Sequence, residues 1–304
     1  MRIALIAGGH GPIPPHGWGA VENLIWNYKL HLEALGHTVD IYNTFLYQEI
    51  ICSLHTRCYD FVHTHYAPFC LPFNKHLGMD YCATVHDGSM ANYIKGVQIP
   101  QFDITIADVL EAPGSFALSE SIRDLYLRKG YRGFLRVLRN AVETEKFRFA
   151  PRGNGKGVCL GKIEPRKRQA VLADLLKDRI HLDFVGPRYP GEEPNFYENA
   201  TCKHLGSWSR DEVYQHLTDY SSLVLYSESE AAPLVVLEAL AAGLSVVATK
   251  SASANLTAEE FITVIPDDER DPAVLDAVIQ GAIEKNNALR KNIRVYAYEH
   301  FDYS

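Results

Sequence analysis

The fold is decided by the stretch SSLVLYSESEAAPLVVLEALAAGLSVVATK, residues 221–250, in which two apolar runs flank a helical segment. The runs SSLVLYS (221–227) and LSVVATK (244–250) have the composition of strands in the interior of a sheet. Between them, Pro233 suits the first turn of a helix and Gly243 suits its end. A strand, a helix and a second strand in this order predict two parallel strands with the helix packed on one face.

The same alternation recurs along the chain. Further strands are predicted at residues 2–7, 38–43, 61–65, 81–87, 155–163, 179–186, 204–208 and 261–266. Helices are predicted at residues 20–36, 210–220, 233–242 and 271–301. A polar stretch at 142–157, rich in glycine, proline and charge, interrupts the series and is expected to link two domains. We therefore expect two Rossmann-like α/β domains, residues 1–145 and 146–304, whose parallel sheets face each other across a ligand-binding cleft.

Composition narrows the class of protein. The chain has 304 residues, 47% of them hydrophobic and 22% charged, as in soluble globular proteins. A formal net charge of -7 argues against a nucleic-acid partner. No apolar run is long enough to span a membrane, and the opening MRIALIAGGHGP is expected to form a strand rather than a signal peptide. Six cysteines without a C-x-x-C pair favour reduced thiols and a cytoplasmic location.

Two carboxylates, Glu230 and Glu238, lie within residues 221–250. An ionised glutamate among apolar neighbours is costly unless a partner compensates its charge. The helix that begins near Pro233 offers a phosphate its free N–H groups, and Glu238 could accept hydrogen bonds from a vicinal diol such as a ribose. Together these features predict a nucleotide-sugar site. The alternative is that both acids are ordinary carboxylates at the start of a helix.

A second cluster, LGKIEPRKRQ (160–169), brings Lys162, Arg166, Lys167 and Arg168 to the end of a predicted strand. Cations fixed at this edge would stabilise the charge that develops on a diphosphate leaving group. The alternative, a solvated basic turn, stays open on spacing alone.

The segment GPIPPHGWGAVE (11–22) places Gly17 and Gly19 before a helix, where backbone can approach a ligand closely. The dinucleotide fingerprint would need a third glycine where Glu22 stands and an acid where Asn43 stands. A dehydrogenase is therefore disfavoured.

Histidines gather at predicted strand ends as His63, His65 and His86. A zinc site built from them would lack a further ligand fixed by spacing. We expect no metal and interpret these histidines as structural groups or as partners of sugar hydroxyls.

Taken together, these features resemble glycosyltransferase family 4, the retaining nucleotide-sugar transferases of GT-B fold. The most specific motif is EAAPLVVLEALAAG (230–243), in which seven residues separate two glutamates ahead of A-x-A-x-G. The resemblance implies that Glu230 contacts the donor sugar and Glu238 the nucleotide ribose. GKIEPRK is similar to the family's G-R-L-x-x-x-K, which implies that Lys162 and Lys167 bind the donor diphosphate.

Other motifs extend the resemblance over nearly the whole chain. GWGAVE resembles the family's glycine-rich loop near the acceptor, which includes Gly17 and Gly19, and VHD resembles the strand end whose histidine, here His86, lies near the donor sugar. RNAVETEKF (139–147) is similar to the passage into the second domain. The resemblance also implies donor-binding positions at Gly161, Pro233 and Leu234.

The sequence departs from the family pattern in three places. Lys162 replaces the usual arginine and loses a bidentate fork for phosphate. EAAP replaces the commoner E-G-F-G, and KSASANL (250–256) stands where a G-G-x-P-E loop is usual.

The resemblance predicts a metal-independent, retaining hexosyl- or related sugar transferase without a cofactor. Its donor would be a UDP- or GDP-sugar, its acceptor a sugar or glycoconjugate, and its role glycan biosynthesis. A catalytically silent nucleotide- or glycan-binding protein and a sugar-nucleotide epimerase are the alternatives. No membrane association is indicated, and the sequence does not specify an oligomeric state.

Overall fold

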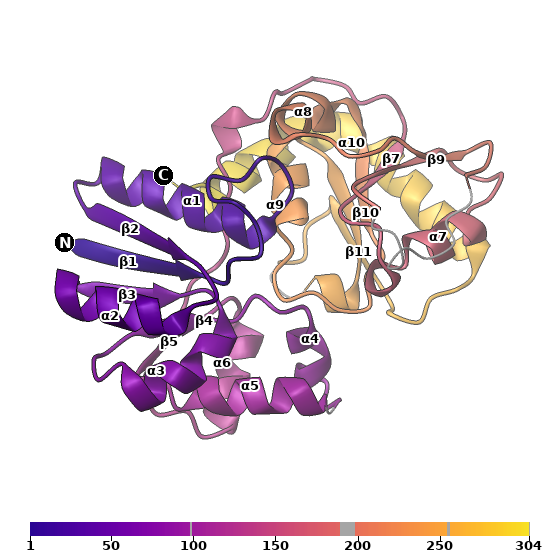
Figure 1. The fold of residues 1–304 in the computed structure, drawn as a ribbon. Coiled ribbons are helices and arrows are strands. Elements are labelled where there is room, and N and C mark those ends of the chain that lie inside the picture. Colours follow the sequence, from indigo (N-terminus) through magenta and orange to yellow (C-terminus); the bar gives the residue numbers. More distant parts are fainter. Residues whose placement is uncertain (98, 189–197, 254–255, 304) are drawn as a thin grey trace. The chain divides into compact units, whose positions relative to one another are not determined.

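A computed structural model describes residues 1–97, 99–188, 198–253 and 256–303 of the chain. The chain divides into two compact units, Met1–Asn140 and Ala141–Ser304 (Figure 1). The division between the units follows Asn140, a few residues before the predicted boundary between residues 145 and 146. That predicted boundary lies within the short 3-10 helix η2, Thr144–Lys146, which belongs to the second unit.

The first unit is built on a six-stranded parallel sheet with the order β2-β1-β3-β4-β5-β6. Its strands are β1 (Arg2–Ala7), β2 (Thr38–Asn43), β3 (Phe61–Thr64), β4 (Cys82–Thr84), β5 (Gly114–Ala117) and β6 (Phe134–Val137). Its helices are α1 (Ala20–Ala34), α2 (Tyr47–Arg57), η1 (Ala67–Phe69), α3 (Cys70–His76), α4 (Ser89–Ile94), α5 (Pro100–Leu110) and α6 (Glu120–Arg128). One core cluster packs Ile3, Leu5 and Val39 of β1 and β2 against Ile25 of α1.

The second unit repeats this architecture with the order β12-β11-β10-β7-β8-β9, again all parallel. Its strands are β7 (Gly157–Leu160), β8 (Leu182–Val185), β9 (Cys202–His204), β10 (Ser222–Leu225), β11 (Ser245–Thr249) and β12 (Ile262–Ile265). Its helices are η2, η3 (Pro165–Lys167), α7 (Gln169–Leu175), α8 (Arg210–His216), η4 (Leu217–Asp219), α9 (Leu234–Ala241), η5 (Lys250–Ala252) and α10 (Pro272–Phe301).

The central strands of the second unit are buried along their whole length, as their apolar sequences predict. Every residue of β7, β8, β10 and β11 is buried. This burial requires helices on both faces of the sheet, since a parallel sheet cannot leave such strands in water. The prediction of two parallel α/β units is confirmed.

The strand predictions need correction in three places, since two strands were absent from them and one was misplaced. The sequence pattern did not indicate β5 or β6, because GSFA is short with three small residues out of four and because FLRV lies at an edge with alternate residues exposed. The strand predicted at 204–208 lies earlier, at β9, because pairing of Leu182 with Cys202 fixes its register.

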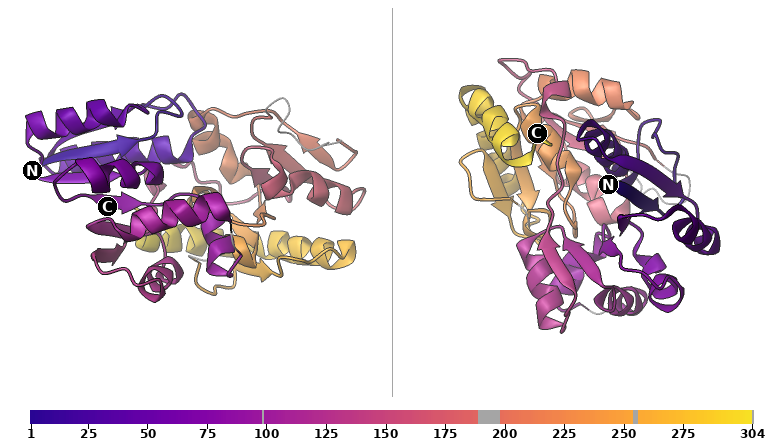
Figure 2. Two further views of the ribbon diagram at one scale, coloured as in Figure 1. Left: turned by 60° about the horizontal axis from the view of Figure 1, so that its bottom comes forward. Right: turned by 90° about the vertical axis from the view of Figure 1, so that its left-hand side faces the viewer.

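The stretch expected to link the domains is part of the second unit. Arg294 of α10 donates hydrogen bonds to the carbonyl oxygens of Thr144 and Phe147, at 3.0 and 2.8 Å. Arg148 N–H donates to the carbonyl of Tyr214 in α8 at 2.9 Å. These bonds hold residues 144–148 against α8 and against the long α10, which is yellow in Figure 2.

No helix within the described ranges is both long enough and apolar enough to cross a bilayer.

Candidate functional site

The topology of the second unit brings two charged loops together. The chain runs outward from β7 through β8 to β9, then returns so that β10 pairs with the other edge of β7. The carboxyl ends of β7 and β10 therefore lie side by side at the point where the strand order reverses. Ligands of open α/β sheets bind outside this point. The loop after β7 contains Lys162 and Lys167, and the loop after β10 contains Glu230.

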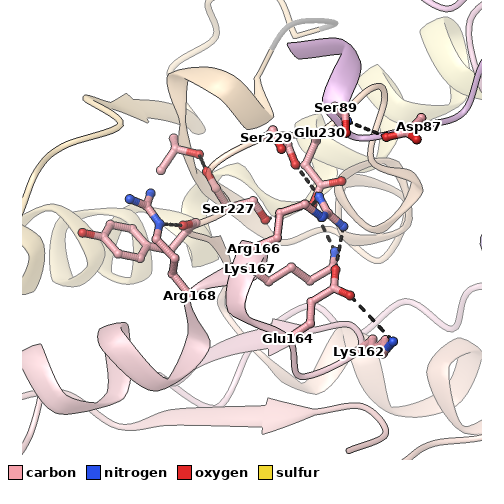
Figure 3. A network of polar contacts seen from close by, with 12 residues as sticks. Asp87, Ser89, Lys162, Glu164, Arg166, Lys167, Arg168, Ser227, Ser229 and Glu230 are labelled. Carbon is pink, nitrogen blue, oxygen red and sulfur yellow. Dashed lines mark hydrogen bonds and ion pairs between the residues drawn. The ribbon is translucent and has the colours of Figure 1, made fainter. Parts of the chain in front are cut away.

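The first of the two glutamates is held by a ring of donors from both loops (Figure 3). Oε1 of Glu230 accepts a hydrogen bond from Lys167 Nζ at 3.1 Å and one from Ser227 Oγ at 2.9 Å. Arg166 Nη1 lies 3.1 Å from the same oxygen and also donates to the carbonyl of Ser229. The partners that the sequence demanded for a buried Glu230 are thus two cations and a hydroxyl.

These contacts fix the charge of Glu230, whose residue surface is only 8% exposed. Burial alone would raise the pKa of this carboxyl, but the Lys167 and Arg166 cations outweigh it and hold the pKa below its ordinary value. Burial likewise works against the Arg166 guanidinium, whose pKa is nevertheless raised by Glu230 and Glu164. At neutral pH the cluster consists of a carboxylate between two cations.

Two glycines at the same edge of the sheet allow the backbone segments after β7 and β8 to approach each other closely. Gly161 follows β7 with φ +147°, and a Cβ there would lie 3.4 Å from Lys167 Nζ. Gly186 follows β8, and a Cβ there would lie 2.0 Å from the carbonyl oxygen of Gly161. Only glycine permits this approach of the two strand ends, and the side chain of Lys167 lies across the space left beside Gly161.

The other side chains of the basic cluster make contacts in two different places. Lys162 and Arg166 lie near Glu164, and Arg168 lies against Tyr226. Lys162 Nζ lies 3.9 Å from Glu164 Oε2, and Arg166 Nη2 donates to Glu164 Oε1 at 2.7 Å. Arg168 turns away: its Nε donates to the carbonyl of Tyr226 at 2.9 Å and its Nη1 to that of Asp267 at 2.8 Å. The expectation that Arg168 joins the other cations is wrong, because its side chain is buried against the Tyr226 ring.

The remaining residues predicted to contact the nucleotide sugar lie in or directly before helix α9. Pro233 is the residue that precedes the helix, and Leu234 begins it. Glu238 is the fifth residue of α9, and the first turn contains no acid, so the alternative of two helix-start carboxylates is wrong. Glu238 is 8% exposed and forms an ion pair with Arg210 of α8.

Two residues of this site were missed by the sequence analysis. Ser227 could have been noticed as a hydroxyl at the end of a strand, three positions before Glu230. Arg210 gives no local signal, because its pairing with Glu238, 28 positions later, depends on tertiary structure.

Gly17, Gly19 and His86 lie in the first unit. Gly19, with φ +135°, precedes α1, and a Cβ there would lie 2.8 Å from Glu22 Oε2. Asn23 Nδ2 donates to the carbonyls of Gly17 and Gly19 at 3.1 and 2.8 Å. The glycine loop is thus tied to the helix that follows it.

Three histidines of the first unit, His63, His65 and His86, form one cluster at the ends of β3 and β4. His65 Nδ1 and His86 Nε2 are 3.0 Å apart, and His63 Nε2 lies 2.8 Å from Thr84 Oγ1. Burial lowers the pKa of His86 to about 4 and that of His63 to about 3. The rings are therefore neutral at pH 7. Among the described residues, no three His, Cys, Asp or Glu side chains are arranged to hold a metal.

The model of the family described as glycosyl transferases group 1 matches residues 141–300, beginning at the first residue of the second unit. The chain belongs to this family. A comparison with curated proteins finds no match.

Solved structures show the same fold over nearly the whole chain. Sucrose-phosphate synthase from Thermosynechococcus elongatus is similar over 99% of this chain and 95% of its own, with a TM-score of 0.80 at 16% identity. HepE from Anabaena, in complex with UDP-glucose, covers 99% of this chain and 96% of its own, with a TM-score of 0.75 at 16% identity. WaaG, a glycosyltransferase involved in lipopolysaccharide biosynthesis, covers 97% of this chain and 95% of its own, with a TM-score of 0.70 at 16% identity. The predicted GT-B fold is confirmed, while the finer assignment to family 4 stays a prediction.

Proposed function

We propose that this glycosyltransferase transfers a sugar, with retention, from a nucleoside-diphosphate sugar to a hydroxyl of a sugar or glycoconjugate acceptor. The observation that carries the proposal is the cluster of Lys167, Arg166 and Glu230 at the point where the strand order of the second unit reverses. Cations at this position suit a diphosphate, and an ionised carboxylate beside them suits sugar hydroxyls. HepE, which has this fold, is described in complex with UDP-glucose and with UDP, which supports a UDP-sugar as the first donor to test.

Lys167 can bind both the Glu230 carboxylate and the donor diphosphate. Its ammonium has three N–H donors, of which the contact with Glu230 uses one. Within the described ranges no other acceptor meets this ammonium, so its remaining N–H groups can bind donor oxygens together with Lys162. The N–H groups at the start of α9, near Pro233 and Leu234, would bind the same diphosphate. Gly161 lets that diphosphate approach the backbone. The two lysines and the helix end supply the positive charge that a metal would otherwise supply, so we propose that no metal or other cofactor is needed.

The proposed reaction breaks the bond between the anomeric carbon and the diphosphate oxygen. The acceptor hydroxyl oxygen bonds to the same face of that carbon, and its proton passes to the departing diphosphate. Glu230 orients the sugar as a carboxylate, Glu238 binds the ribose, and His86 contacts a sugar hydroxyl. Gly17 and Gly19 are assigned to the acceptor side.

The test is release of nucleoside diphosphate from UDP-, GDP- and ADP-sugars, with and without sugar acceptors. We expect acceptor-dependent release from one donor, reduced at least a hundredfold in Glu230→Gln and Lys167→Ala. Lys177→Ala, which removes an exposed cation in the turn that follows α7, is the matched control and should retain activity. An NMR spectrum of the product's anomeric signal tests retention.

Other outcomes identify the alternatives. Thermal stabilisation by a donor without release would indicate a binding protein. Conversion of the donor sugar without an acceptor would indicate an epimerase. Activity that disappears with EDTA and returns with Mg²⁺ would overturn metal independence.

A further inference from the structure

Arg210 occupies a position that helix electrostatics disfavour. It is the first residue of α8, directly after the capping residue Ser209, where the positive end of the helix dipole repels a cation. Its side chain is nevertheless mostly buried, with 23% exposed. Such a placement needs a compensating partner.

The partner is Glu238, in the middle of α9. Arg210 Nη1 donates to Oε1 of Glu238, whose side chain is 11% exposed. Burial lowers the pKa of the Arg210 guanidinium, but Glu238 and Tyr214 more than offset this, and the pKa lies above its ordinary value. The Arg210 guanidinium therefore keeps its positive charge throughout the physiological range.

Aromatic rings hold the guanidinium in one place. Its central carbon lies 4.5 Å from the ring centre of Tyr214, one turn along α8, and 5.7 Å from that of Phe147. A planar guanidinium stacked on a ring can adopt few orientations, so its hydrogen bond also fixes the plane of the carboxylate. Among the described residues, no hydrogen bond reaches Oε2 of Glu238, and this oxygen is left for a ligand.

We propose that Arg210 is a positioning residue that gives the second unit its preference for ribose over 2′-deoxyribose nucleotides by holding the Glu238 carboxylate in one orientation. The inference rests on the proposed donor site, in which Glu238 binds the ribose. A carboxylate held by one oxygen presents the other to a vicinal diol at a fixed angle. A carboxylate free to rotate loses part of that selectivity, even though its charge is unchanged.

The experiment measures the affinities of the full chain for UDP and 2′-deoxy-UDP by calorimetry, with the guanine and adenine pairs as further probes. Loss of a hydrogen bond to a charged group costs on the order of tenfold in affinity, so the wild type should prefer the ribonucleotide by about that factor. Glu238→Gln should reduce the preference. Arg210→Met should reduce it severalfold while Glu238 is still present.

The matched control is Lys146→Met. Lys146 Nζ lies 5.9 Å from the ring centre of the same Tyr214 and pairs with Glu143 rather than with Glu238. Its removal takes a cation from that ring without touching the carboxylate, and should leave the ribose preference as in the wild type. Arg210→Lys keeps the charge but not the planar fork, and it gives a second variant should Arg210→Met fold poorly, as judged by thermal unfolding.

The results separate the two proposals. A preference that is lost in Glu238→Gln but intact in both Arg210 variants would overturn the role of Arg210 alone. Equal binding of both nucleotides by the wild type would overturn the ribose role of Glu238, and Arg210 would then have no preference to set. No binding of any nucleoside diphosphate would overturn the donor site itself.

Discussion

Lys167 Nζ and Glu230 Oε1 are 3.1 Å apart, although the two residues are separated by 63 positions in the sequence. The contact joins the loop after β7 to the loop after β10, and Arg166 approaches the same oxygen from the same turn as Lys167. The arrangement of the two loops and the ionised state of Glu230 therefore depend on each other. Loss of one cation should change both.

Lys167→Met should destabilise the chain by roughly 1–3 kcal/mol at pH 7, because a buried carboxylate loses one of its charged donors while Arg166 remains. The pKa of folded Glu230 lies below that of the unfolded chain. Its contribution to stability is therefore present above the unfolded value and is lost as pH falls through the folded value.

The variant lacks part of this contribution, so its unfolding free energy should approach that of the wild type as pH falls from 7 to 3. Urea unfolding across this range measures the difference, with Lys177→Met as the control for removing a lysine. A difference that stays constant over the whole range would show that Lys167 does not stabilise the ionised form of Glu230.

Gly186→Ala should disrupt the candidate diphosphate site more than any change of charge. The new Cβ would lie 2.0 Å from the carbonyl oxygen of Gly161, and φ at this position is +151°. Strand ends must separate, so we expect a loss of at least about 3 kcal/mol in stability and of measurable nucleotide binding.

Gly281→Ala is the matched control. Gly281 lies inside α10, and its Cβ would meet nothing within 4 Å. Because alanine is the better helix former, this variant should gain about 0.5–1 kcal/mol. Equal effects of the two substitutions in urea unfolding would contradict the close approach of Gly186 and Gly161.

The sequence predicted those strands and helices that depend on local residue patterns. The strand–helix–strand pattern of 221–250 predicted β10, α9 and β11, because apolar runs and the Pro233 and Gly243 signals are short-range. It also predicted that Glu230 needs a partner, but it assigned the basic cluster 160–169 to a diphosphate and did not connect that cluster to Glu230.

Contacts between elements could not be predicted in the same way. Arg168 and Lys167 are neighbours in sequence, yet the left-handed conformation of Arg168, with φ 51°, turns its side chain toward Tyr226. Arg210 has no distinguishing feature in the helical pattern, and only the folded chain brings it to Glu238. Such pairings depend on tertiary structure, which no spacing rule contains.

Arg290 should be the most sensitive position of α10. Its side chain is 1% exposed and donates to the carbonyls of Ala150, Tyr220 and Thr218, as well as to Asn286. Arg290→Met would leave these oxygens buried without donors, and we expect a loss of about 3–5 kcal/mol in chemical denaturation.

Arg179→Met is the comparison for this change. Arg179 is 43% exposed on its side chain and lies 4.0 Å from Asp276, so its removal should cost less than about 1 kcal/mol. Similar losses for the two variants would show that the carbonyl contacts of Arg290 contribute little.

The histidine cluster of the first unit should make that unit sensitive to acid. His63 and His86 have folded pKa values of about 3 and about 4, both below the ordinary value of 6.5, because burial disfavours the charged ring. The unfolded chain therefore binds more protons than the folded chain below pH 6.5. The contribution of these neutral rings to the free energy of unfolding is fully present only above that pH. It should fall as pH drops from 6.5 toward 4, with each ring contributing a slope of up to about 1.4 kcal/mol per pH unit.

His63→Gln should remove one share of this slope while keeping a side chain that can bond to Thr84. Phe61→Leu, a change to a ring 6.0 Å from that of His63, removes packing without a titrating group and should cost the same at every pH. Urea unfolding at pH 7, 6 and 5 distinguishes the two, and NMR of the ring protons reads the histidines directly. A midpoint near 6.5 for His63 or His86 in the folded chain would contradict the prediction, because a ring that charges at its ordinary pKa cannot be the source of the slope.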